Sequence, residues 1–101
     1  MYYMIEITSR QRKSLEKYAQ SLSPVVMIGQ NGVTTAVEDM TDKSLASHEL
    51  IKIKFLEFKD NKCDLATGLA EKCNAALVRV IGNIAILYRE AEKKENRKYK
   101  I

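Results

Sequence analysis

Apolar residues recur along this chain with two spacings, one typical of helices and one typical of strands. The first stripe with helical spacing lies in residues 9–22 and consists of Leu15, Tyr18, Ala19 and Leu22. Thr8 or Ser9 can cap this helix, because Gln11 stands where a capping box needs a side chain that reaches back. Pro24 is predicted to end the helix, since the residue before a proline avoids the α region.

A wholly apolar run, residues 25–28 (VVMI), follows the proline. This run predicts a central strand that is buried on both faces. Thr34 or Thr35 can then cap a second helix, which His48 and its neighbours close. The inward positions of this helix are expected to be Val37, Met40, Thr41 and Leu45, with Thr41 facing Met27.

Alternation with period two marks the next strand, residues 50–56, with its apolar side chains inward and Lys52 and Lys54 outward. A third helix is expected from about residue 60 to 74. Residues 76–81 and 84–88 then form a β-hairpin around a Gly-Asn turn. The order α-β-α-β-α-β-β predicts an α/β (α+β) domain, with one pair of strands in the hairpin antiparallel and some parallel pairing across the helices.

One domain is expected over residues 1–89, followed by a basic C-terminal tail, residues 90–101, as a frayed or disordered segment. The chain lacks an apolar run of about 20 residues, and its first residues do not resemble a signal peptide. A cytoplasmic monomer without a membrane contact is therefore expected.

Positive charge is concentrated at the two ends of the chain. Residues 1–28 carry four basic and two acidic side chains, a net charge of +2. Residues 89–101 carry six basic and three acidic ones, a net charge of +3, whereas residues 29–88 have a net charge of −1. This distribution is typical of a neutral body with basic surfaces for a polyanion, although basic ends can also serve solubility alone.

Enzyme chemistry finds little support in the sequence. The single histidine, His48, stands at a predicted helix end, where a cation favours the helix dipole. Cys63 and Cys73 are ten residues apart on one predicted helix, too far for a disulfide within it. No nucleophile–base arrangement, P-loop or metal-ligand spacing is evident, so neither catalytic residues nor a metal or cofactor are expected.

The most distinctive motif is Gly29-Gln30-Asn31-Gly32, a glycine loop between an apolar strand and a capped helix. Glycines allow positive φ and close approach of a ligand to the backbone. The helix behind the loop directs free N–H groups toward it, which favours an anion. Tight strand-to-helix turns also use glycine for geometry alone, so the loop by itself does not decide between binding and structure.

Four segments in this order resemble the YhbY-like proteins, whose module is known in plants as the CRM domain (chloroplast RNA splicing and ribosome maturation). These segments, which together span about residues 7–89, are 8–12 (TSRQR), 22–34 (LSPVVMIGQNGVT), 48–54 (HELIKIK) and the pair 78–83 (VRVIGN) and 86–89 (ILYR). The resemblance implies a four-stranded mixed sheet with three helices, similar to the C-terminal domain of translation initiation factor 3. It also implies RNA binding through the glycine loop and neighbouring basic groups.

Two positions depart from the family's pattern, because Gln30 and Asn83 are neutral where relatives often carry a lysine or arginine. The expected RNA contacts therefore include cations outside the loop. The complete predicted set of RNA-binding residues is Gly29, Gln30, Asn31, Gly32, Arg10, Arg12, Lys13, Lys17, Lys52, Lys54 and Arg89.

For stand-alone bacterial members, the resemblance implies association with rRNA in precursors of the large ribosomal subunit during assembly. The alternative is a protein-interaction module that contacts ribosomal proteins or another assembly factor. Salt dependence separates the two hypotheses, because RNA binding weakens steeply as salt rises and an apolar protein interface responds little.

Overall fold

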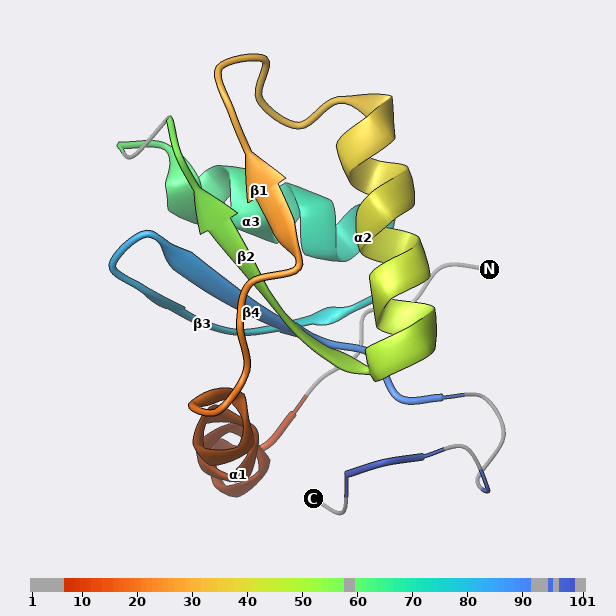
Figure 1. Cartoon of the computed structure of the whole chain (residues 1–101). Helices are drawn as coiled ribbons and strands as arrows, with labels where there is room; N and C mark the ends of the chain where they lie inside the picture. Colours follow the sequence, from red (N-terminus) through yellow and green to blue (C-terminus); the bar gives the residue numbers. More distant parts are fainter. Residues whose placement is uncertain (1–6, 58–59, 92–94, 96, 100–101) are drawn as a thin grey trace.

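The computed structural model describes residues 7–57, 60–91, 95 and 97–99 and shows helices and strands in the predicted order (Figure 1). Their bounds are α1 Ser9–Ala19, β1 Val26–Ile28, α2 Thr35–His48, β2 Leu50–Phe55, α3 Lys62–Lys72, β3 Ala76–Ile81 and β4 Ile84–Tyr88. The predicted α+β class, with three helices and a four-stranded mixed sheet, is confirmed.

The strands lie in the order β1-β2-β4-β3. β1 pairs with β2 in parallel, and β4 pairs antiparallel with both β2 and β3. Gly82, at φ 57, makes the hairpin turn possible between β3 and β4. The next residue, Asn83, accepts a hydrogen bond from the backbone N–H of Phe55 at 2.8 Å. The hairpin is thereby tied to the end of β2.

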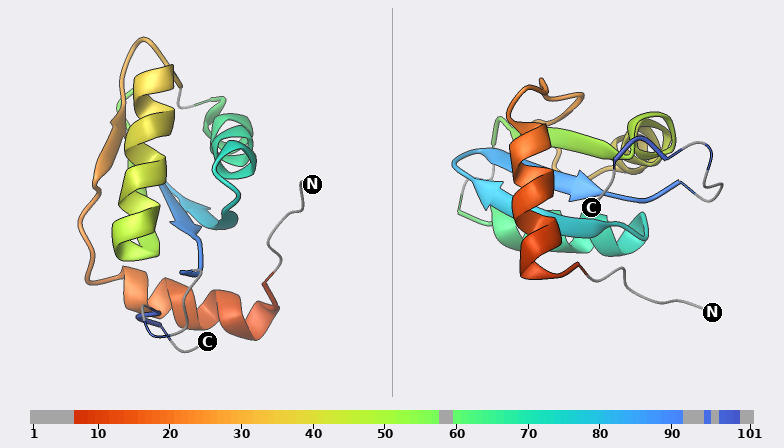
Figure 2. Two further views of the ribbon diagram at one scale, coloured as in Figure 1. Left: turned by 90° about the vertical axis from the view of Figure 1, so that its right-hand side faces the viewer. Right: turned by 90° about the horizontal axis from the view of Figure 1, so that it is seen from below.

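Helices cover the two faces of the sheet unequally (Figure 2). α2 and α3 pack on one face, and α1 packs on the other, against β2, β3 and β4. The larger core lies under α2 and α3, with Ile28, Ile53 and Phe55 among its buried residues. The smaller core lies under α1 and comprises Leu15, Ala19, Leu50, Val78, Ile86 and Tyr88. Part of the sheet on the α1 side is therefore open.

The prediction that residues 25–28 form a central strand buried on both faces is wrong. β1 is an edge strand, and the side chains of Val25 and Met27 are 44% and 55% exposed. The reason is that α1 does not extend over β1. Met27 consequently lies on the face opposite α2 and does not meet Thr41, whose hydroxyl donates to the Val37 carbonyl instead. Met40 was also expected inward but is 52% exposed.

The first helix ends earlier than predicted. α1 stops at Ala19, and a turn in which Leu22 N–H donates to the Ala19 carbonyl leads away from it, before Pro24 is reached. The capping box is present as expected, with Thr8 and Gln11 bonded to one another's backbone N–H groups. Tyr18 was expected to be buried, but it is 45% exposed at the edge of the packed side.

The expectation of a frayed or disordered tail is wrong for the tail residues that the structure describes. Ala91 and Lys98 donate backbone hydrogen bonds to the buried carboxylate of Glu49. Tyr99 packs against the core under α1. A buried acceptor in the folded body thus holds this part of the tail in place.

Candidate nucleic-acid interface

α1 carries an exposed stripe of cations. Leu15 and Ala19 are completely buried and fix which side of the helix faces the sheet. At about 100° per residue, Arg10, Lys13 and Lys17 fall within one narrow arc on the opposite side. All three are exposed, and none pairs with an acidic side chain among the described residues. We call these three residues the basic stripe.

Arg12, by contrast, points toward the sheet. Its guanidinium donates to the backbone carbonyl of Val78 at 2.6 Å and, with a longer contact of 3.5 Å, to that of Leu77. Nearby, Glu16 of α1 pairs with Arg79 of β3 at 2.9 Å. These contacts fix α1 across the strands, so Arg12 has a structural role that the basic stripe depends on.

The glycine loop, residues 29–32, is a tight turn closed by a hydrogen bond from Gly32 N–H to the Gly29 carbonyl at 3.0 Å. Gly32 adopts φ 71, which explains a glycine there. Gly29 lies outside the left-handed region, and a Cβ added to it would meet no atom within 4 Å. The fold therefore gives no steric reason for a glycine at position 29, and the space beside its Cα is open to a ligand.

The second helix begins directly after the glycine loop. Thr34 caps α2, its hydroxyl accepting from the N–H of Val37 at 3.2 Å. The N-terminal end of α2 therefore lies beside the loop, as predicted, where the helix dipole favours an anion. Glu38 in the first turn is paired with Lys72 of α3 at 3.3 Å, which moderates its repulsion of an anion.

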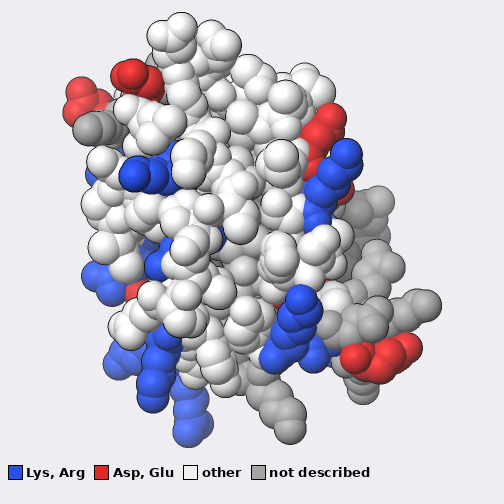
Figure 3. Space-filling model, in the orientation of Figure 1, with Lys and Arg blue, Asp and Glu red and all other residues white. Residues whose placement is uncertain are grey.

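The glycine loop and α1 lie at opposite ends of the molecule (Figure 1). Basic side chains gather around α1 at one end, whereas at the loop end of the same view the tip is uncharged and acidic side chains lie to either side of it (Figure 3). The whole chain measures 38 × 28 × 22 Å. The structure thus does not bring these two predicted groups of RNA-binding residues together, and one ligand must be extended to reach both.

Lys54 and Lys52 project from β2 on the open face between the two ends. Lys54 is exposed and sits beside Met27 in the strand register. Lys52 is half-buried, and its ammonium donates to the Leu22 carbonyl at 3.0 Å. A hollow of about 250 Å³ lies beside the packed contact, between α1 and the uncovered part of this face. The residues lining it are Glu16, Ala19, Gln20, Lys52, Arg79, Ile81, Ile84 and Ile86.

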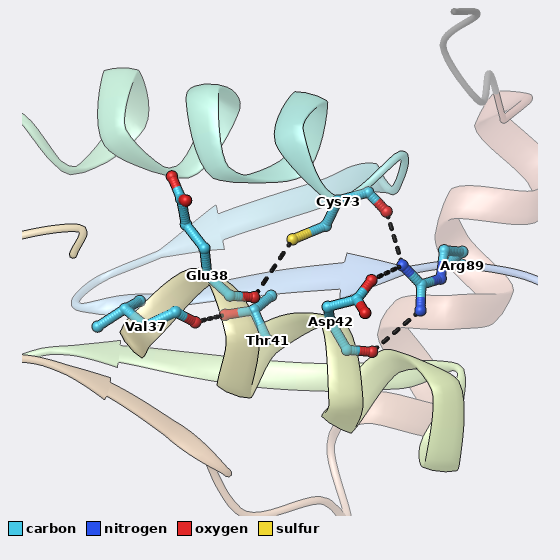
Figure 4. A network of polar contacts seen from close by, with 6 residues as sticks. All are labelled: Val37, Glu38, Thr41, Asp42, Cys73 and Arg89. Carbon is cyan, nitrogen blue, oxygen red and sulfur yellow. Dashed lines mark hydrogen bonds and ion pairs between the residues drawn. The ribbon is translucent and has the colours of Figure 1, made fainter. Parts of the chain in front are cut away.

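Arg89 lies in a polar network on the far side of the sheet (Figure 4). Its guanidinium donates to the Asp42 carboxylate at 2.6 Å, to the Asp42 carbonyl at 3.0 Å and to the Cys73 carbonyl at 2.8 Å. The Cys73 thiol contacts the Glu38 carbonyl, and burial raises the pKa of this thiol, with a further contribution from Asp42. Arg89 thereby joins the end of β4 to α2 and to the end of α3.

Two residues of interest escaped sequence reasoning. Glu49 looked like an ordinary acid between a helix and a strand, yet it is 2% exposed and accepts hydrogen bonds from the tail. Tyr18 was assigned to the core, yet it is 45% exposed, and its ring centroid lies 5.1 Å from that of Tyr99. Only the meeting of distant segments reveals either role, so the local pattern held no signal for them.

Within the described part of the chain, no cluster of three or more histidine, cysteine or acidic residues could hold a metal ion. Cys63 and Cys73 are both free, Cys63 exposed and Cys73 buried. None of the described helices has the length and apolar composition needed to cross a membrane.

Comparison with known proteins gives a consistent result. Residues 7–89 match the model of the CRS1 / YhbY (CRM) domain. A protein from Haemophilus influenzae named "RNA-binding protein" is 35% identical over 91 residues, which covers 89% of this chain and 92% of the relative. "Probable RNA-binding protein YqeI" of Bacillus subtilis is 31% identical and is covered to 98% of its length, with 94% of this chain aligned.

The solution structure of SAV1595 from Staphylococcus aureus is similar to the present structure, with a TM-score of 0.78 and 31% identity. The match covers 94% of this chain and all of that one. Sequence motifs, sheet order and relatives therefore agree, and this chain belongs to the CRS1 / YhbY (CRM) domain family.

Proposed function

We propose that this protein binds structured RNA, namely rRNA in precursors of the large ribosomal subunit, and assists their assembly without catalysing a reaction. The observation that carries the proposal is the basic stripe, three exposed cations on α1 that pair with no acidic side chain among the described residues, in a family whose relatives are named RNA-binding proteins. Cations that form no ion pair with an acidic side chain of the same protein are free to neutralise phosphates and release counterions. The protein would act in the cytoplasm as a monomer.

The two ends of the molecule would contribute differently to this binding. The basic stripe would supply the electrostatic part of the affinity, with Lys54 continuing the charge onto the open face. The glycine loop, which is neutral, would let the RNA backbone approach its main chain and the N-terminal end of α2. Contacts to phosphates at both ends would set the register of the RNA rather than read its bases.

Three of the predicted RNA-binding cations carry less weight in this proposal. Arg12, Lys52 and Arg89 all donate hydrogen bonds to backbone carbonyls within the protein. Moving any of them to a phosphate would leave those carbonyls without their partners, which costs about 1–3 kcal/mol for a buried group. We therefore assign RNA contact first to Arg10, Lys13, Lys17 and Lys54.

The alternative function, a protein-interaction module, is favoured by one observation. Apolar side chains on the open face of the sheet are substantially exposed, among them Met27 at 55%, Ile81 at 50% and Val25 at 44%. Such a patch can bind a protein partner. RNA remains the better proposal because α1, which carries the basic stripe, packs on the same face of the sheet, and because the relatives carry the names of RNA-binding or probable RNA-binding proteins.

Sedimentation of cell lysate tests the ribosomal part of the proposal. At low salt the protein should comigrate with precursors of the large subunit, and high salt should release it. A folded Gly29→Asp/Gly32→Asp variant should stay at the top of the gradient. Wild-type protein that remains at the top at low salt would contradict the ribosome assignment. Comigration of both proteins regardless of salt would favour the protein-interaction alternative.

A further inference from the structure

The tail is anchored by a buried acid. Glu49 follows α2 in a left-handed conformation, at φ 64, and is 2% exposed. Its carboxylate accepts hydrogen bonds from the backbone N–H of Ala91, at 2.7 Å, and of Lys98. Two backbone donors on one carboxylate form a charge-assisted anchor, and losing it would leave a buried charge without partners.

Side chains of the tail strengthen the same arrangement. Lys98 donates its ammonium to the carbonyl of Ser47 at 2.8 Å. Arg97 donates to the Ala91 carbonyl and pairs with Glu90, each at 2.9 Å. These contacts hold Lys98 at the C-terminal end of α2 and set the position of the residue that follows it, Tyr99.

Tyr99 lies against α1. Its ring centroid is 5.1 Å from that of Tyr18, and the two ring planes are tilted by 60°. Tyr99 also packs on the core under α1, and this burial raises the pKa of its phenol. On α1, Tyr18 falls between the basic stripe and the buried side of the helix, with 45% of its side chain exposed. An accessible pair of aromatic rings therefore borders the basic stripe.

The contact between Tyr18 and Tyr99 joins the two basic ends of the sequence. Residues 1–28 have a net charge of +2 and residues 89–101 a net charge of +3. Figure 2 shows the described tail segment beside α1, on the side of the molecule away from α3. Sites for single-stranded nucleic acid combine these two elements, cations along the backbone path and aromatic rings on which bases stack.

We propose that the docked tail and α1 form one RNA-binding surface, in which an unpaired base of the RNA stacks on the Tyr18–Tyr99 pair. This inference rests on the proposed function and specifies the ligand as RNA with a single-stranded segment next to a helix. Stacking tolerates every base, because each has a π-face. The surface would therefore add affinity for loops and bulges without demanding a sequence.

Substitutions at position 99 in the full-length chain test the proposal. Tyr99→Leu keeps apolar volume against the core but removes the ring, whereas Tyr99→Phe keeps the ring. Binding is measured to two RNAs, a stem with an unpaired loop and the same stem as a blunt duplex. We expect Tyr99→Leu to weaken binding to the looped RNA about fivefold or more. Tyr99→Phe should bind like wild type, and the duplex should not distinguish the proteins.

Two further measurements separate stacking from a loss of folding. The chain contains no tryptophan, so quenching of tyrosine emission on addition of the looped RNA reports stacking, and it should weaken in Tyr18→Leu and Tyr99→Leu. Met40→Ala, an exposed residue on α2, serves as the matched control and should bind normally. Thermal unfolding verifies that every variant is folded at the temperature of the binding assay.

The outcomes distinguish this inference from the function on which it rests. If Tyr99→Leu binds the looped RNA as tightly as wild type while loss of the basic stripe weakens binding, the stacking surface is wrong and the proposed function stands. If the wild-type protein binds neither RNA even at low salt, the proposed function fails and the inference fails with it.

Discussion

The α1 end and the glycine-loop end of this molecule offer RNA different chemistry on one fold. α1 presents three cations on a helix that is rigidly held by Arg12 and by the Glu16–Arg79 pair. The glycine loop presents main chain and two neutral amide side chains, with open space beside Gly29. Charge acts over about 10 Å at ordinary salt, whereas a backbone contact acts only on touching. The comparison predicts that affinity depends mainly on α1 and that precise placement depends on the loop.

Removing the basic stripe should have the largest effect. The variant Arg10→Gln/Lys13→Gln/Lys17→Gln keeps good helix formers on an exposed side, so its stability should change by less than about 1 kcal/mol. RNA affinity near 0.1 M salt should fall by about two orders of magnitude, because three phosphate contacts are lost. Filter binding or fluorescence anisotropy measures the change. The control Lys43→Gln/Lys62→Gln removes two charges from α2 and α3, away from α1. An equal loss of affinity per charge in this control would mean that the stripe contributes only nonspecific charge.

Gly29→Ala should sharpen the comparison at the other end. The added methyl meets no atom within 4 Å, so the folded state tolerates it, and a less flexible unfolded chain should raise stability by about 0.5 kcal/mol. RNA affinity should nevertheless fall about tenfold if the RNA backbone approaches this Cα as closely as a phosphate contact requires. Gly82→Ala, in the hairpin turn at φ 57, is the control, with lower stability and unchanged affinity. A Gly29→Ala protein that binds normally would make the loop a purely structural turn.

Arg89→Lys should separate structural cations from binding ones. The substitution keeps the charge but loses the fork that reaches both Asp42 and the Cys73 carbonyl. The free energy of unfolding should decrease by about 2 kcal/mol, measured by denaturant titration. RNA affinity of the folded protein should stay within a factor of two of wild type, on the order expected when no phosphate contact is lost. A clear loss of RNA affinity without a loss of stability would indicate that Arg89 contacts the RNA.

Tyr88 gives a smaller, pH-dependent effect beneath the tail. Burial, followed by Glu90 and Glu49, raises the pKa of its phenol to about 12 from an ordinary 10.0. The folded protein holds this proton more tightly than the unfolded chain. The contribution of Tyr88 to the free energy of unfolding is therefore fully present below pH 10 and is lost as pH rises toward 12. Ultraviolet titration of phenolate should show a late-titrating component near pH 12 that Tyr88→Phe diminishes. Its hydroxyl has no hydrogen-bond partner in the described structure, so Tyr88→Phe should cost little at neutral pH.

Local patterns predicted the elements well because each element has a local physical cause. The capping box at Thr8 and Gln11, alternation in β2 and the Gly-Asn hairpin turn act within a few residues. Local patterns failed where a segment distant in sequence determines whether a residue is buried. Nothing near residues 25–28 indicates that α1 stops short of β1, so the exposure of Met27 could not be foreseen. The tail docks through hydrogen bonds from Ala91 and Lys98 to Glu49. These two residues lie 42 and 49 positions after Glu49 in the sequence.

The candidate interface shows the same division. The residue types of the candidate interface were predictable, because cations and glycines are read directly from the sequence. Which of these cations are available to RNA was not predictable. In the sequence, a cation that donates to a backbone carbonyl cannot be told from one that is free. Arg12 and Lys13 are neighbours in the chain, yet only Arg12 bonds to the sheet. The helical position of each relative to Leu15 and Ala19 decides this, and that position follows from which face α1 buries.

The salt dependence of RNA affinity tests the central claim most directly. A log–log plot of affinity against salt should fall with a slope of roughly −0.7 to −0.9 for each phosphate neutralised. We predict that loss of Arg10, Lys13 and Lys17 makes this slope shallower by about two units or more, while Gly29→Ala weakens binding with the slope unchanged. Equal slopes for wild type and the stripe variant, or affinity indifferent to salt, would contradict the assignment of RNA binding to α1.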